Sequence, residues 1–202
     1  MQYERNEHAR EVIAAHYNHT PSAYVRCFGC QQNVNDSERL KGVLQDLGFT
    51  LAPAPEEADL IVFNTCAIRE HAEQRVFGNI GALKSLKQQK PGLLIAICGC
   101  MAVEKATVDK LRESFPYVDI VRGPTPADLM GQMLVERMTT RKRALRVPTL
   151  REEIVEQVPL VRESSFRAFL PIRYGCDNFC SYCIVPYVRG RERSRLSQDI
   201  LA

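Results

Sequence analysis

Eight cysteines are the residues of this 202-residue chain most able to do chemistry. Three of them, Cys176, Cys180 and Cys183, share one short segment with CxxxCxxC spacing. Three thiolates on one tight loop can ligate three irons of a [4Fe–4S] cluster and leave the fourth iron without a protein ligand. That iron can chelate the amino and carboxylate groups of S-adenosylmethionine and pass an electron to its sulfonium. The spacing predicts a radical S-adenosylmethionine cluster, with the aromatic face of Tyr182 beside the adenine.

Two simpler interpretations of this cysteine segment are a zinc knuckle and a run of free thiols. Zinc sites normally have four protein ligands, and no fourth Cys or His lies near Cys183. A zinc ribbon that joins the pair Cys27 and Cys30 to the pair Cys180 and Cys183 would combine segments about 150 residues apart. The iron–sulfur interpretation is therefore favoured.

Three further cysteines, Cys30, Cys66 and Cys100, each follow an expected strand and precede an expected helix. The carboxyl ends of parallel strands meet at one edge of a sheet, where helix N-termini also favour negative charge. We therefore expect these thiols to converge on a second metal site. Buried structural cysteine is the alternative, and it is the expectation for Cys27 and Cys98, which lie inside strands.

The elements that must position these thiols alternate short apolar runs with helical patterns. Strands are expected over residues 23–28, 59–64, 93–98 and 118–121. A helix is expected after each strand, the first with Asn35 as N-cap and Glu38 completing a capping box, the last opened by Thr125 and Pro126. Continuous apolar strands separated by helices predict an α/β fold with a doubly wound parallel sheet.

The expected organisation has four parts. Residues 1–21 form a loose N-terminal tail, residues 22–138 the α/β domain, residues 139–165 a charged linker with room for one short strand, and residues 166–202 the start of a second domain. In that last part an apolar element over 167–173 leads into Cys176, and a dense basic stretch over 187–195 follows the cysteines. The basic stretch suits either a nucleic-acid backbone or solvent.

Composition narrows the class of protein. The hydrophobic fraction is 45%, the charged fraction 25% and the net charge +3, as in an ordinary globular protein. No apolar run approaches the roughly 20 residues that cross a bilayer, and the polar N-terminus lacks the core of a signal peptide. We expect a cytoplasmic protein with no membrane partner, whose cysteines stay reduced rather than forming a secreted disulfide framework.

The motifs together resemble the methylthiotransferase family of radical S-adenosylmethionine enzymes. The similarity extends from about Tyr24 to the end, on the segments GCQQNVNDSER (29–39), NTCAIRE (64–70), CGCM (98–101) and GCDNFCSYCIVPYVRGRERSR (175–195). Within the family, the first two segments most resemble the members that act on isopentenylated adenosine in tRNA. Members that modify a ribosomal-protein aspartate or a threonylcarbamoyl adenosine usually differ there, and they remain the alternative.

The resemblance implies an enzyme with two [4Fe–4S] clusters, in which Cys176, Cys180 and Cys183 hold the one that cleaves S-adenosylmethionine and Cys30, Cys66 and Cys100 hold an auxiliary one. The implied reaction places a methylthio group on C2 of N6-isopentenyladenosine 37 in the tRNA anticodon loop. A 5′-deoxyadenosyl radical removes the hydrogen, a second S-adenosylmethionine supplies the methyl group, and the auxiliary cluster presents the sulfur. An electron donor such as a flavodoxin or ferredoxin is also implied.

The chain departs from the family pattern in two places. The family continues with the rest of a radical (β/α) barrel and a small β-domain, and a barrel needs on the order of 200 residues. Only its first strand and cluster loop are expected here, so we expect a truncated chain that is inactive alone. At Val121-Arg122-Gly123-Pro124 the family tends to have Phe-Gly-Thr. A non-catalytic iron–sulfur or zinc-binding module is the alternative from another class.

Overall fold

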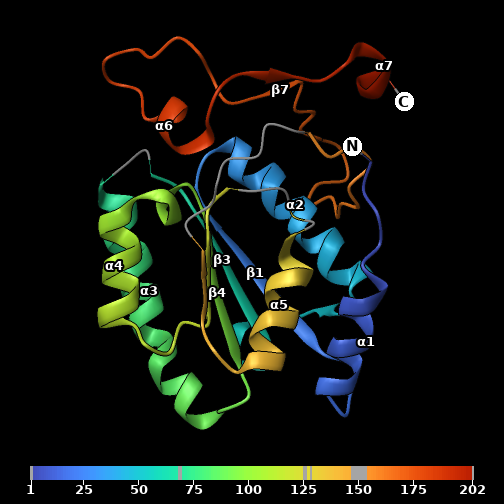
Figure 1. The fold of residues 1–202 in the computed structure, drawn as a ribbon, viewed down its shortest axis with the longest axis vertical. Coiled ribbons are helices and arrows are strands. Elements are labelled where there is room, and N and C mark those ends of the chain that lie inside the picture. Colours follow the sequence, from blue (N-terminus) through green and yellow to red (C-terminus); the bar gives the residue numbers. More distant parts are fainter. Residues whose placement is uncertain (1, 68–69, 125–126, 128, 147–153, 202) are drawn as a thin grey trace.

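A computed structural model describes residues 2–67, 70–124, 127, 129–146 and 154–201. Figure 1 shows a central sheet with helices on both sides and, across one end, the C-terminal segment, by which we mean residues 160–201. The elements are α1 (Glu7–His16), β1 (Ser22–Phe28), α2 (Gln31–Asp46), β2 (Thr50–Leu51), η1 (Pro55–Glu57), β3 (Leu60–Thr65), α3 (Glu70–Gln89), β4 (Leu94–Gly99), η2 (Cys100–Val103), α4 (Lys105–Ser114), β5 (Ile120–Arg122), α5 (Leu129–Thr140), β6 (Ala144–Arg146), β7 (Arg173–Tyr174), α6 (Val185–Arg189), β8 (Arg193–Ser194) and α7 (Ser197–Leu201).

The main sheet has six parallel strands in the order β2-β1-β3-β4-β5-β6. The chain steps outward from β1 to β2 on one side and then from β3 to β6 on the other. The strand order therefore reverses between β1 and β3, which is where doubly wound sheets bind ligands at the carboxyl ends of their strands. The expected α/β fold with a doubly wound parallel sheet is confirmed.

Each face of the sheet has its own hydrophobic core. Along β3, Leu60 and Val62 pack on the side of α1, α2 and α5, whereas Ile61 and Phe63 pack on the side of α3 and α4. This alternation follows from the two-residue period of a strand. Both β3 and β4 are buried along their whole length, which explains their continuous apolar sequences.

The N-terminal residues contain a packed helix, so the expectation of a loose tail over 1–21 is wrong. Ala9 and Ile13, one helical turn apart, are buried where α1 contacts α5. The side chain of Asn6 caps the helix by accepting a hydrogen bond from the Ala9 amide at 2.9 Å. Only two apolar residues of α1 are fully buried, and the many charges around them concealed this face in the sequence.

The first helix of the sheet domain begins earlier than its capping pattern predicts. α2 begins at Gln31 with Cys30 as its N-cap residue, so Asn35 and Glu38 lie inside the helix. Glu38 is 2% exposed and accepts hydrogen bonds from Arg162 at 3.0 Å and from the Glu163 amide at 3.1 Å. The predicted capping box is therefore wrong, because this carboxylate binds the segment that follows the sheet domain.

The remaining expectations concern the second half of the chain. The short strand expected within 139–165 is present as β6, and Val155 and Val158 are buried in the core beside α2 and α5. Thr125 and Pro126 lie outside the described residues. The expected strand over 167–173 is wrong in extent, because β7 has only two residues and pairs with β8, antiparallel. None of the described helices combines the length and apolarity needed to span a bilayer.

Candidate functional site

The dispersed cysteines lie at the carboxyl ends of three neighbouring strands. Cys30 follows β1, Cys66 follows β3, and Cys100 opens η2 directly after β4. The thiols of Cys30 and Cys66 are hydrogen-bonded, and this contact lowers the pKa of Cys30 more than burial raises it. Cys66 and Cys100 are 5% and 3% exposed. The sheet thus brings the three thiols to one edge, as their positions after strands predicted.

A buried amide network holds the ends of these strands together. The Asn33 side chain in α2 donates to the Thr65 carbonyl at 2.8 Å and to Asn64 Oδ1 at 3.3 Å. Asn64 donates in return to the Asn33 carbonyl at 2.9 Å and to Ser37 Oγ at 3.0 Å. Every one of these side chains is buried, so the network fixes α2, β3 and the loops that carry Cys30 and Cys66 in one arrangement.

Gly99 allows the close approach of β4 to β3 just before Cys100. Its φ is +99°, and a Cβ there would collide with the Thr65 carbonyl. The hydroxyl of Thr65 donates to the Cys98 carbonyl at 2.7 Å on the same pair of strands. A side chain at position 99 would therefore displace the turn that places Cys100 beside the other thiols.

Arg189 connects the C-terminal segment to this thiol edge. It lies at the end of α6, is almost buried, and forms an ion pair with Asp36 of α2 at 2.8 Å. Burial alone would lower the pKa of Arg189, but Asp36 and Cys100 together raise it above its ordinary value. Burial raises the pKa of Cys100, and the guanidinium opposes that effect by charge and by a hydrogen bond.

The second cysteine set occupies a loop closed by backbone contacts. The Cys176 amide donates to the Gly190 carbonyl at 3.1 Å, and the Cys183 amide donates to the Cys180 carbonyl at 2.9 Å. Gly175 has a φ of +72°, and a Cβ there would collide with the Arg191 carbonyl. Cys180 is exposed, and the other two thiols are half-buried. The loop therefore presents its thiols toward the outside of the chain.

Asp177 fixes this loop to the strand that follows it. Its carboxylate accepts from the Glu192 amide at 2.9 Å and from Arg191 Nε at 2.8 Å. These two contacts, the amide first, lower the pKa of Asp177. Tyr182 is 91% exposed, so the side chain expected beside the adenine of S-adenosylmethionine stands in solvent here.

A cavity of about 390 Å³ separates the thiol edge from the C-terminal segment. Cys30, Cys100 and Arg189 line it together with residues 170–175 just before the cysteine loop. Apolar side chains, including Ile172 and Val188, make up much of the rest. This space adjoins the thiols of Cys30 and Cys100, and an apolar lining with a few polar groups has the character of a small-molecule site.

Each of the two groups of three cysteines has the thiol ligands that an iron–sulfur cluster requires, but their sulfur atoms are not yet arranged around a common point. All eight cysteines are free, and each set offers three thiols near helix ends, turns or a guanidinium. Yet in the described ranges no three His, Cys, Asp or Glu side chains are placed to hold a metal ion together. The ligand roles of Cys30, Cys66, Cys100, Cys176, Cys180 and Cys183 therefore stay a prediction.

The cysteines expected to be structural, Cys27 and Cys98, lie inside the strands β1 and β4. Cys98 is 4% exposed, and burial raises its pKa to about 12. Cys27 is half-buried, and burial raises its pKa as well. Burial favours the neutral form of both thiols, as it does for Cys100.

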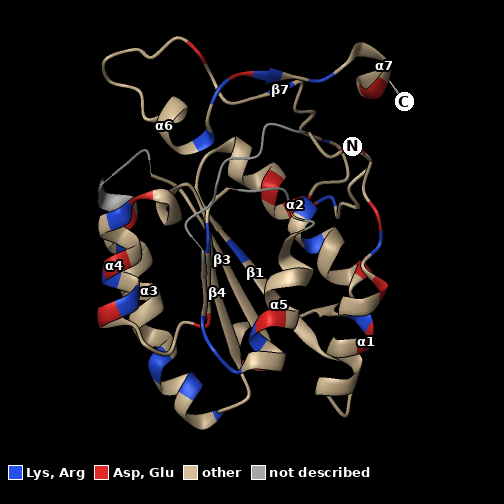
Figure 2. Ribbon diagram, in the orientation of Figure 1, with Lys and Arg blue, Asp and Glu red and all other residues tan. Residues whose placement is uncertain are grey.

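Sequence reasoning missed the polar residues that organise the site. Asn33, Asp36 and Asn64 carry no individual signal in the sequence; the one local hint is that five of the six residues after Cys30 (QQNVND, 31–36) are polar. Arg189 was counted only as part of a basic stretch. Figure 2 shows positive and negative residues adjacent along that segment. Arg189, Arg191 and Arg195 each form an ion pair with a carboxylate of the chain, to Asp36, Asp177 and Glu156.

Comparison with known proteins gives one family and several close relatives. The model of "Uncharacterized protein family UPF0004" matches residues 22–123. A protein of Caldicellulosiruptor saccharolyticus named tRNA-2-methylthio-N(6)-dimethylallyladenosine synthase is 49% identical over 178 residues, which cover 88% of this chain and 38% of that protein. Proteins of the same name from Clostridium perfringens and Clostridium tetani are 48% and 45% identical, with 88% and 94% of this chain and 40% and 42% of their own lengths covered.

The chain thus spans about two-fifths of the length of the curated relatives it matches. The family match covers the strands β1 to β5 and all three dispersed cysteines. It therefore coincides with the sheet edge described above. On this match the chain belongs to the UPF0004 family.

Proposed function

We propose that this chain acts in the methylthiolation of tRNA, as part of a cytoplasmic radical S-adenosylmethionine methylthiotransferase. The observation that carries the proposal is the cavity that places Cys30 and Cys100 opposite the segment leading into the cysteine loop. A reaction that joins a carbon radical to sulfur needs two centres on either side of one substrate space. The names of the relatives support tRNA as the substrate class.

The six thiols have two roles in this proposal. Cys176, Cys180 and Cys183 would hold the [4Fe–4S] cluster that binds S-adenosylmethionine, and Cys30, Cys66 and Cys100 would hold the auxiliary one. When bound, the first would supply one electron for cleavage of S-adenosylmethionine and the second would present sulfur to C2 of N6-isopentenyladenosine 37.

The residues around the thiols would prepare the two centres. Arg189 places a fixed positive charge beside Cys100 and favours its thiolate, as a ligand requires. Asn33 and Asn64 hold the ends of these strands, so that the loops of Cys30 and Cys66 need little rearrangement. The exposed face of Tyr182 would pack on the adenine of S-adenosylmethionine.

The tRNA and the electron donor are proposed as partners. The internal ion pairs of Arg189, Arg191 and Arg195 leave these three arginines little free charge for an RNA backbone. We therefore propose that contacts to the anticodon loop come mainly from parts that the longer relatives have beyond the matched region. The 202-residue chain alone would then bind both clusters but not modify tRNA. A flavodoxin or ferredoxin would deliver the electron.

Anaerobic reconstitution with iron and sulfide tests the cofactor content of the proposal. Two clusters predict about eight irons per chain by metal analysis and a [4Fe–4S] Mössbauer signature. Cys66→Ala and Cys176→Ala should each lose about half of the iron, whereas Cys27→Ala should keep all of it. Stoichiometric zinc, or equal iron in all three variants, would contradict the two-centre assignment.

The substrate is tested in a strain that lacks its own tRNA methylthiotransferase. The full-length protein that contains this chain should restore 2-methylthio-N6-isopentenyladenosine in sequenced tRNA, and the 202-residue chain should not. Restoration by a full-length Cys176→Ala variant would refute the proposed radical chemistry. If the full-length protein modified a ribosomal-protein aspartate or threonylcarbamoyl adenosine instead, the proposed substrate would be wrong.

A further inference from the structure

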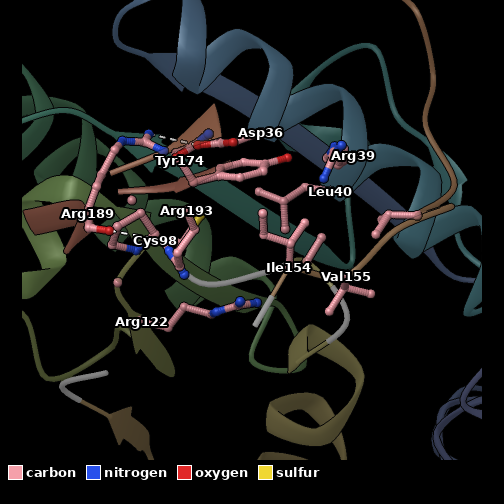
Figure 3. Close-up of a pocket in the computed structure, with 16 residues that line it drawn as sticks. Asp36, Arg39, Leu40, Cys98, Arg122, Ile154, Val155, Tyr174, Arg189 and Arg193 are labelled. Carbon is pink, nitrogen blue, oxygen red and sulfur yellow. Dashed lines mark hydrogen bonds and ion pairs between the residues drawn. The ribbon is translucent and has the colours of Figure 1, made fainter. Parts of the chain in front are cut away.

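A second cavity lies beside the first, at the carboxyl ends of β4 and β5 (Figure 3). Its described polar lining includes Asp36, Tyr174 and four arginines, Arg39, Arg122, Arg189 and Arg193. Leu40, Val155 and Val158 form an apolar wall. Neither cysteine set lines this cavity, so its ligand would not depend on the clusters of the proposed function.

The charge of the described lining favours an anion. Asp36 is its one carboxylate, and the ion pair with Arg189 at 2.8 Å already engages it. Arg122 is 3% exposed and stands at the end of β5, paired in register with Cys98 of β4. Within the described residues Arg39 contacts the Tyr174 ring but has no carboxylate partner, and a guanidinium shielded from bulk water favours one.

Two buried donors of the cavity also lack a hydrogen-bond partner in the described part of the chain. They are the hydroxyl of Tyr174 and Nε of Arg39. The Arg39 guanidinium lies 5.8 Å from the centre of the Tyr174 ring, and Figure 3 shows the hydroxyl directed toward it. An oxyanion between them would accept from both and remove the cost of leaving them unpaired.

We propose that this cavity binds a phosphate group. Tyr174 and Arg39 donate hydrogen bonds to its oxygens, and Arg122 of β5 and Arg193 of β8 supply positive charge. Figure 3 shows Arg122 and Arg193 extending into the cavity from different elements. A tetrahedral group with several acceptor oxygens suits donors that arrive from separate directions, and the apolar wall suits the organic part of a phosphate ester.

Titration of the intact chain with inorganic phosphate tests this site by calorimetry, at constant ionic strength against chloride. The unmodified chain should bind phosphate saturably. Tyr174→Phe, which removes only a hydroxyl, should weaken binding about fivefold, and Arg39→Met at least tenfold. Tyr187→Phe and Arg75→Met, which make the same changes at exposed positions, should bind as the unmodified chain does.

The source of the phosphate follows from a second titration with adenosine monophosphate. A tighter fit for the nucleotide, lost in Arg39→Met, would assign a phosphate ester, and equal affinities would assign free phosphate. The absence of saturable binding of either compound to the unmodified chain would overturn the proposal. Equal weakening by Arg39→Met and Arg75→Met would do the same, since it would reduce the effect to net charge.

Discussion

The sheet domain and the C-terminal segment differ in where their large apolar side chains lie. In the sheet domain they fill two cores, one on each face of the sheet. In the segment they face solvent, and within the described residues every exposed large hydrophobic side chain lies at or after Leu160. Phe166 and Tyr182 are 92% and 91% exposed. A stretch this apolar on the surface normally marks an interface.

The two regions therefore owe their structure to different interactions. The sheet domain is held by continuous strand pairing and apolar burial. The segment has one two-residue strand pair, and it is held mainly by ion pairs to the domain and to the preceding residues, through Arg189 and Arg195. The proposed auxiliary centre thus rests on a rigid frame, and the proposed S-adenosylmethionine centre on one that a few polar contacts define.

The largest effect that tests this comparison is expected from the sheet core. Ile95 in β4 is completely buried, and Ile95→Ala should lower the free energy of unfolding by about 3 kcal/mol, because the lost methyl and methylene groups leave a cavity. Phe166→Ala in the segment should change it by less than about 0.5 kcal/mol. Urea denaturation followed by circular dichroism measures both. Similar losses would mean that Phe166 is buried in solution and that the comparison is wrong.

A smaller effect is expected at the contact between the two regions. Arg189→Met leaves Asp36 without its partner and should weaken docking of the segment by about 1–3 kcal/mol. Arg191→Met is the matched control two residues away, because its ion pair with Asp177 is exposed and should contribute less than about 1 kcal/mol.

Hydrogen exchange measures this docking directly. In Arg189→Met the amides of the C-terminal segment should exchange faster while those of β3 and β4 keep their protection. Faster exchange in the sheet as well would show that Arg189 stabilises the whole chain rather than the contact. Equal effects of the two substitutions would show that burial of the Arg189 pair is irrelevant.

The parts of this fold that sequence predicted are those with local causes. β3 begins with four consecutive apolar residues, Leu60 to Phe63, and is buried throughout, and such apolar runs also predict the position of each thiol after a strand. α1 was not predicted because two buried apolar residues among charges, Ala9 and Ile13, give a weak local signal; the burial comes from packing against α5. The start of α2 escaped because Cys30 is not among the residues that usually cap helices.

The site contacts that sequence could not predict join distant residues. Arg189 and Asp36 are 153 positions apart, and nothing local distinguishes this arginine from Arg191. Asn33 and Asn64 are 31 positions apart in the sequence, and the residues around each of them do not distinguish it from an ordinary polar residue. Such contacts depend on how the sheet brings loop ends together, so they become visible only once the strand order is known.

The smallest expected effect is a difference in acid sensitivity between two carboxylates, one in each region. Asp59 has a lowered pKa: burial opposes the shift, but the Ser22 amide and His19 outweigh it. Asp177 has a lowered pKa through the Glu192 amide and Arg191. A carboxylate whose pKa is lower when folded stabilises fully above its unfolded value of about 3.9 and loses that contribution as the pH falls through its folded value. Between about pH 5 and pH 2, unfolding of Asp59→Asn should therefore depend less on pH than that of the unmodified chain.

Asp177→Asn should instead leave unfolding unchanged and remove the acid-induced shift of the Glu192 amide in NMR spectra, because Asp177 orders a loop that the sheet does not need. If Asp177→Asn altered the acid unfolding of the sheet as much as Asp59→Asn, the two regions would be one cooperative unit.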